Sequence, residues 1–183
     1  FFHGAGGTDA YVGLLDYWFE LEDHLTDAGF VVVMDAVDAF APPEVRGAQW
    51  ADVLDSLVAD GVGRRFNVIG HSQGGLDARY VAGVLGYHDR IVSVVTVATP
   101  HRGTPVADAG IGLVQAAPWL VDGAAGVLAG LTGLGDAAAV EQVASMTTVG
   151  MAEFNANVLN HPDVYYASYA GKTCSILDFI CQA

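Results

Sequence analysis

The sequence predicts an α/β protein, with a mostly parallel sheet and helices on both of its faces. Short apolar runs typical of buried strands alternate with stretches that carry apolar residues at helical spacing, as a parallel sheet demands. A glycine-flanked serine turn joins one such run to a helix at residues 66–84. Apolar residues make up 52% of the chain and charged residues 15%, which excludes an intrinsically disordered protein.

The alternation runs through most of the chain. The first expected helix carries Trp18, Leu21 and Leu25 and ends at Gly29, and a strand follows at 30–34. Pro42 and Pro43 introduce a second helix, which carries Trp50, Leu54, Leu57 and Val58 and ends at Gly61. The remaining expected elements are a strand at 66–69, a helix at 76–84, and strands at 91–97 and 164–169. No linker or internal repeat divides them. Residues 1–183 are therefore expected to form a single domain.

The most informative turn is the G-x-S-x-G pattern at residues 70–74. A strand precedes it and a helix follows, and this setting holds a serine in a strained turn with its hydroxyl exposed. The flanking Gly70 and Gly74 leave room for the tight crossing of strand and helix, and His71 completes the turn. This context predicts that Ser72 is a nucleophile. The alternative is a glycine-rich turn with an uninvolved serine.

A second glycine-rich loop opens the chain. The H-G-x-x-G sequence from His3 to Gly7 follows the end of a strand and suits a loop whose backbone N–H groups bind a developing oxyanion. Ala5 is the expected donor here, and Gln73, directly after the candidate nucleophile, is the second. Gly4 supports the loop. We expect His3 to orient the loop through hydrogen bonds rather than to act as a base.

Three motifs in fixed order, at residues 3–9, 70–76 and 98–104, resemble the secreted bacterial true lipases, the family I triacylglycerol lipases. The likeness spans about residues 1–170 and is extended by residues 11–18, 79–82, 154–155 and 164–166. It implies the α/β-hydrolase fold and a carboxylic-ester hydrolase of lipase type, with Ser72 as nucleophile and the Ala5 and Gln73 amides as the oxyanion hole. The family usually carries a larger apolar residue at position 5, but this role uses the backbone alone.

A base and an orienting carboxylate are harder to find. After Ser72 this fold supplies them in the order acid, then histidine. His88, His101 and His161 lie in turns or loops that do not suit a base. Asp178 follows the strand at 164–169, at a place in the fold that would suit the acid, but its neighbours Leu177 and Phe179 favour a surface turn. The resemblance places both residues beyond Ala183, so the C-terminal part of the fold is expected to lie outside these residues. It also implies a structural calcium ion with ligands outside this chain, so no metal ligand is assigned and no cofactor is required for the chemistry.

Residues 105–150 differ in character from the rest. They carry aspartate and glutamate but no lysine or arginine, and they are rich in Ala, Gly, Leu and Val. A helical insertion at this place in a lipase-like chain is interpreted as a lid that contacts a lipid–water interface. The alternative is ordinary helices that cover the sheet. Pro118, Asp122 and many glycines argue against a membrane span.

Charge and cysteines bear on partners and location. The net charge is −14, which disfavours nucleic acid and anionic membrane surfaces as partners. We expect a secreted, monomeric protein that acts on a lipid ester, with a folding or secretion chaperone as a further partner by resemblance. Cys174 and Cys181 are separated by six residues, and an exported protein favours a disulfide between them; reduced thiols, or pairing with other cysteines, stay open.

Two classes of function remain as alternatives to a lipase. A short-chain carboxylesterase or another acyl hydrolase would use the same residues and differ in the preferred acyl chain. A non-catalytic, lipid-binding hydrolase homologue would need neither the serine turn nor the oxyanion loop. Both motifs are intact in residues 3–7 and 70–74, which favours an enzyme.

Overall fold

The computed structural model describes residues 1–7, 18, 20–116 and 137–171. Its sheet contains β1 (Phe66–His71), β2 (Ile91–Val97) and β3 (Tyr165–Tyr169) in the order β1-β2-β3, and all of these strands are parallel. Phe2 forms a parallel bridge with Gly70 on the edge of β1 that β2 does not occupy. The start of the chain therefore lies beside the strand that leads to Ser72.

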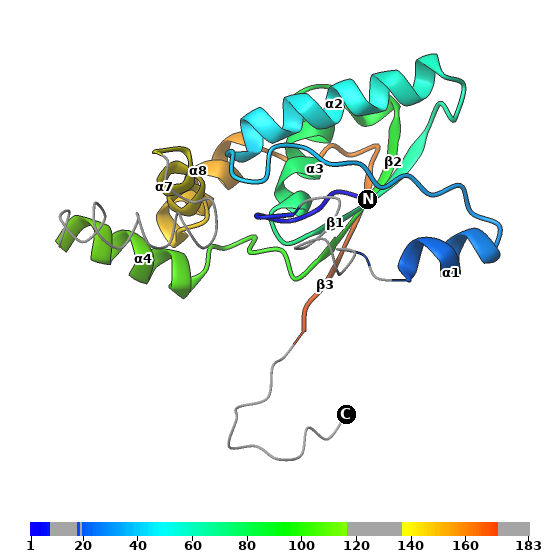
Figure 1. Cartoon of the computed structure of the whole chain (residues 1–183). Coiled ribbons are helices and arrows are strands. Elements are labelled where there is room, and N and C mark those ends of the chain that lie inside the picture. The colour runs from blue at the N-terminus through cyan, green and yellow to red at the C-terminus, as the bar shows by residue number, and fades with distance from the viewer. Residues whose placement is uncertain (8–17, 19, 117–136, 172–183) are drawn as a thin grey trace.

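Helices connect and cover these strands (Figure 1). In chain order they are α1 (Leu21–Asp27), α2 (Pro43–Ala59), α3 (Gly74–Gly83), the short 3-10 helix η1 (Tyr87–Asp89), α4 (Pro105–Ala116), α7 (Ala137–Ser145) and α8 (Thr148–Asn157). Helix α3 crosses from β1 to β2 and packs on both strands, and α2 packs on α3. A parallel sheet flanked by helices confirms the fold class predicted from the sequence.

The core fills the space between the sheet and α2 and α3. Phe2, Trp50, Leu54, Val68 and Val81 are among its buried members. The Phe2 and Trp50 rings stack with centroids 4.0 Å apart. Because Phe2 packs against α2 and bridges β1, the first residues of the chain are held directly beside the serine turn.

The predicted strand at residues 30–34 is wrong. The segment has no ladder partner in the described part of the chain, and Phe30 and Val31 are 63% and 80% exposed. One hydrogen bond links it to the start of the chain, from the Phe1 amino group to the Val33 carbonyl (2.8 Å), and the Phe30 N–H donates to the Leu25 carbonyl of the preceding helix (3.0 Å). Such isolated bonds do not make a ladder, so an apolar run with strand character stays an extended connection between α1 and α2.

The described ends of the predicted insertion pack on one another. Helix α4 contacts α7 and α8, and the Asp108 carboxylate accepts a hydrogen bond from the Thr148 N–H (2.8 Å). The insertion's last residues, 148–150, begin α8, whose Met151 is buried against Leu76 of α3. Whether residues 105–150 act as a lid stays a prediction.

Two further expectations fall partly or wholly outside the described residues. The predicted disulfide between Cys174 and Cys181, and Asp178, lie in the segment 172–183. Among the helices that are described, none is long and apolar enough to cross a membrane.

Candidate active site

Ser72 occupies a strained turn between β1 and α3. Its φ of 52° lies in the left-handed region, which is uncommon for a residue other than glycine. The turn is fastened to the sheet because the Ser72 N–H donates to the Val97 carbonyl at the end of β2 (2.9 Å). Gly74 is required here, because a Cβ at this position would lie 2.6 Å from the His3 carbonyl oxygen. This is the geometry of a nucleophile elbow.

Two backbone donors of the predicted oxyanion hole are free to bind a ligand. Neither the Ala5 nor the Gln73 N–H donates a hydrogen bond to any acceptor within the described part of the chain. Gln73 directly precedes the first turn of α3, where the helix dipole adds positive potential. Both groups therefore suit a developing negative charge.

The direction of the Ala5 N–H is fixed through the Gly4 carbonyl. This oxygen faces hydrogen-bond donors from Gly7 N (3.1 Å), His3 Nδ1 (2.8 Å) and an Arg46 guanidinium nitrogen (3.3 Å). The Gly4 carbonyl and the Ala5 N–H belong to one planar trans peptide, so they point in opposite directions. Holding the oxygen from one side therefore aims the N–H to the other.

His3 has both ring nitrogens engaged inside the loop. Its Nε2 accepts a hydrogen bond from the Val37 N–H (3.0 Å), which places the proton on Nδ1, where it donates to the Gly4 carbonyl. The ring is buried and packs edge-on against Trp50. This arrangement suits the orienting role predicted for His3, not a base that exchanges a proton with substrate.

Arg46 of α2 joins the loop to α3. The side chain is fully buried and donates to the His3 carbonyl (2.5 Å), the Asp38 carbonyl (2.9 Å) and the Asp77 carboxylate (2.8 Å). Asp77 is also fully buried, one turn into the helix that follows Ser72. The ion pair thus links the two halves of the candidate oxyanion hole.

Burial raises the pKa of Asp77 to about 7, against the opposing effects of the Arg46 charge and the Trp50 indole N–H. Between the usual value of 3.8 and about 7, the folded protein holds a proton on Asp77 that the unfolded chain has released. The free energy of unfolding of the wild type, minus that of Asp77→Asn, should therefore fall as the pH rises through this window. Urea unfolding at several pH values measures it. A difference that rises with pH would contradict the assignment.

Gln73 is anchored by its side chain as well. Its Nε2 donates to the Ala41 carbonyl (2.7 Å), and its Oε1 accepts from Gln142 of α7 (2.6 Å). Gln142 donates in addition to the Ala39 carbonyl (3.1 Å). Because Gln142 belongs to the predicted insertion, this segment touches the residue whose amide is to bind the oxyanion.

The three histidines weighed as bases, His88, His101 and His161, hydrogen-bond or stack elsewhere. His101 bonds Thr96 (2.9 Å), and the rings of His88 and His161 stack on each other with centroids 3.7 Å apart. Burial lowers the pKa of His71, which lies at the end of β1. Within the described residues no hydrogen bond joins a histidine to the Ser72 hydroxyl, so no base is assigned from this geometry.

The sequence interpretation missed Arg46 and Asp77. A signal was present, because Arg46 lies four residues before Trp50 and eight before Leu54, on the apolar stripe of its helix. A charge on a core-facing stripe needs a buried partner. Its partner could not be named, since Asp77 lies 31 residues further along the chain.

Solved structures show the fold of this chain. The mature form of the Bacillus licheniformis lipase BlEst2 superposes with a TM-score of 0.67, covering 91% of this chain and 62% of its own, at 23% sequence identity. Its propeptide form gives a TM-score of 0.70 over 91% and 34% of the two chains, at 22% identity. This likeness shows that the chain has the α/β-hydrolase fold, in which the serine turn and the glycine loop take their expected places.

The family follows from the sequence comparisons. A family model described as palmitoyl protein thioesterase matches residues 3–172, and the chain belongs to this family. A triacylglycerol lipase of Vibrio cholerae is 33% identical over 162 residues, which are 84% of this chain and 51% of the relative. One of Pseudarthrobacter phenanthrenivorans is 38% identical over 109 residues, 58% and 34% of the two chains. The lipase-like relationship predicted from the motifs is confirmed, and the chain spans about a third to a half of these curated relatives.

Proposed function

We propose that the protein is a carboxylic-ester hydrolase of the triacylglycerol lipase type, with Ser72 as its nucleophile. One observation carries the proposal. Ser72 is held at a φ of 52°, and two backbone N–H groups that bond nothing in the described structure accompany it, one at Gln73 directly after it and one at Ala5 in the glycine loop. Such a constellation serves acyl transfer, where an oxygen becomes negatively charged beside the attacked carbon.

The Ser72 oxygen attacks the ester carbonyl carbon, and its proton passes to a base. The carbonyl oxygen becomes an oxyanion that the Ala5 and Gln73 amides bind. Collapse of this intermediate breaks the bond to the alcohol, which leaves with the proton, and water then hydrolyses the acyl-enzyme. The proposal places the histidine base and its acidic partner beyond Ala183, together with the ligands of any structural calcium ion.

The substrate class is proposed from the relatives. Triacylglycerol lipases match this chain over much of its length, and a lipid ester at a lipid–water interface is the corresponding substrate. Secretion, a folding chaperone and a mobile lid at 105–150 belong to the same proposal. The family description supports a second candidate, a thioester, since the same nucleophile and oxyanion hole act on a thioester carbonyl. Parallel assays with an oxygen ester and a thioester of one acyl chain separate the two.

Covalent labelling tests the nucleophile. An alkylphosphonate that reacts with activated serines should add once to the intact protein carrying these residues, on the peptide that contains Ser72. Ser72→Ala should abolish the adduct. Ser56→Ala is a matched control, since the Ser56 hydroxyl is exposed on α2 and bonds the Asp52 carbonyl; this variant should label like the wild type. Mass spectrometry of the digested protein reads the outcome, and labelling that persists in Ser72→Ala overturns the proposal.

A further inference from the structure

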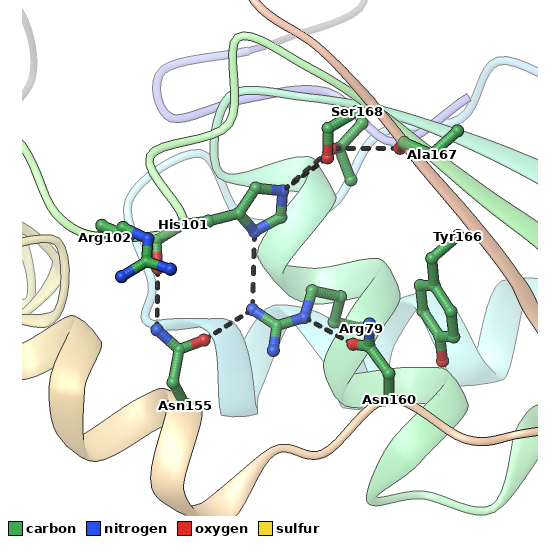
Figure 2. A pocket seen from close by; sticks show the side chains of 9 residues that line it. Arg79, His101, Arg102, Asn155, Asn160, Tyr166, Ala167 and Ser168 are labelled. Carbon is green, nitrogen blue, oxygen red and sulfur yellow. Dashed lines mark hydrogen bonds between the residues drawn. The ribbon is translucent and has the colours of Figure 1, made fainter.

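A pocket built from other side chains than those of the candidate oxyanion hole lies where α3, α8 and the strands β2 and β3 meet (Figure 2). Its volume is about 380 Å³. The lining residues are Arg79, Thr96, His101, Arg102, Asn155, Asn160, Tyr166, Ala167 and Ser168. None of them is acidic, although the chain has 21 acidic residues against 7 lysines and arginines. The pocket therefore gathers positive charge in an acidic protein.

Arg79, at the centre of this pocket, bonds neutral groups. Its guanidinium donates to the side-chain oxygens of Asn155 (2.8 Å) and Asn160 (3.1 Å) and to the Val158 carbonyl (3.0 Å). No carboxylate lies within 4 Å of Arg79 or Arg102 in the described part of the chain. A partly buried cation without a counter-charge attracts an anion, because the surrounding protein screens it less than water does.

The hydrogen bonds from Arg79 run in one direction. Arg79 can only donate, so His101 Nδ1 accepts from it (3.4 Å) and the ring proton sits on Nε2, which donates to the Thr96 hydroxyl (2.9 Å). Burial and the Arg79 charge lower the pKa of His101, which disfavours the protonated ring. The Thr96 hydroxyl then donates to Ser168 Oγ (2.9 Å), a shorter contact than the 3.4 Å to the Ala167 carbonyl. The Ser168 O–H remains at the end of this chain of donors.

The other lining side chains also have protons to donate, and their oxygens already accept a hydrogen bond from the protein. The Asn155 and Asn160 side-chain oxygens already accept from Arg79. The Tyr166 hydroxyl accepts from the His161 N–H (3.1 Å), and its own proton has no acceptor among the described residues. The same holds for the Asn160 amide protons and the exposed Arg102 guanidinium. Figure 2 shows these groups arranged around the pocket.

We propose that this pocket binds a small carboxylate anion. A carboxylate accepts only, it offers about four lone-pair sites, and its plane matches the two parallel N–H groups of a guanidinium such as that of Arg102. One negative charge suits the site better than a phosphate dianion, because neutral donors supply most of the contacts. The inference rests on residues outside the candidate oxyanion hole and holds whether or not Ser72 is the nucleophile.

Titration followed by NMR tests the proposal. Sodium acetate, compared with sodium chloride at equal ionic strength, should shift the backbone N–H signals of His101 and Ser168 in a saturable way, with a Kd on the order of 1 mM. Arg102→Gln should raise this Kd about tenfold, because it removes a charge-assisted contact. Arg65→Gln removes an arginine that is also exposed but lies outside the pocket, and it should leave the Kd unchanged. Ser168→Ala is the second pocket variant and should raise the Kd by less than Arg102→Gln does.

Each other result decides against the proposal. Shifts with acetate that do not saturate, or an equal Kd in the Arg102→Gln and Arg65→Gln variants, overturn it. If inorganic phosphate binds more tightly than acetate, the pocket is a phosphate site and the carboxylate proposal is wrong. Acetate will also have no effect if an aspartate or glutamate side chain of the same polypeptide forms an ion pair with Arg102. In that case the protein supplies the carboxylate, and the proposal of a free carboxylate ligand is wrong.

Discussion

Replacing Arg46 with methionine is expected to slow phosphonate labelling of Ser72 about a hundredfold and to cost about 3–5 kcal/mol of unfolding free energy at pH 8. The loss of stability arises because Asp77 would be left buried without its cation. The loss of rate arises because the His3 and Gly4 carbonyls lose a shared donor, so the loop that carries the Ala5 N–H is held less firmly. Urea unfolding and the labelling rate measure the two effects separately.

The double variant Arg46→Met, Asp77→Leu is the matched control. It removes both buried charges, so it should recover most of the stability, as exchanges of a buried ion pair for apolar side chains often do. It should not recover the labelling rate, because the Gly4 carbonyl still lacks the Arg46 donor. Full recovery of both would show that Arg46 matters only for folding, and wild-type behaviour of Arg46→Met itself would remove it from the site.

Gly74→Ala is expected to destabilise the protein by about 3 kcal/mol. The new methyl group would lie 2.6 Å from the His3 carbonyl oxygen and press on the Phe2 backbone. Backbone atoms cannot rotate away as a side chain does, so the Phe2 and His3 backbone must move from α3. The oxyanion loop moves with it, and labelling of Ser72 should fall in the same variant.

Gly112→Ala makes the same chemical change in a different setting. Gly112 lies in α4, and a Cβ there meets nothing within 4 Å. Alanine in an open helical position should raise stability by about 0.5–1 kcal/mol. Thermal unfolding of both variants compares them directly. If Gly74→Ala unfolds like the wild type, the close approach of α3 to the Phe2 and His3 backbone is not a constraint.

Local pattern was enough for much of the fold. The helix at 43–59, with a proline at its start and a left-handed Gly61 after its end, follows from apolar spacing and terminal residues. The strands at 66–71 and 91–97 follow from apolar, β-branched runs. The segment 30–34 has the same composition, yet it forms no ladder in the described structure. A run of apolar residues gives a preference for strand, but partners from elsewhere in the chain decide whether the strand forms.

The sequence by itself determined the elbow at Ser72, the glycine loop at residues 3–7 and the class of fold. Each of these depends on residues that are close together in the chain and that require a particular backbone conformation. The tertiary structure alone decided what holds these parts together. Arg46 meets His3 across 43 residues and Asp77 across 31, and Arg79 meets Asn155 across 76. Such contacts depend on the packing of α2, α3 and α8, which no local pattern specifies. A buried charge must find its partner in the folded chain, since water cannot supply it there.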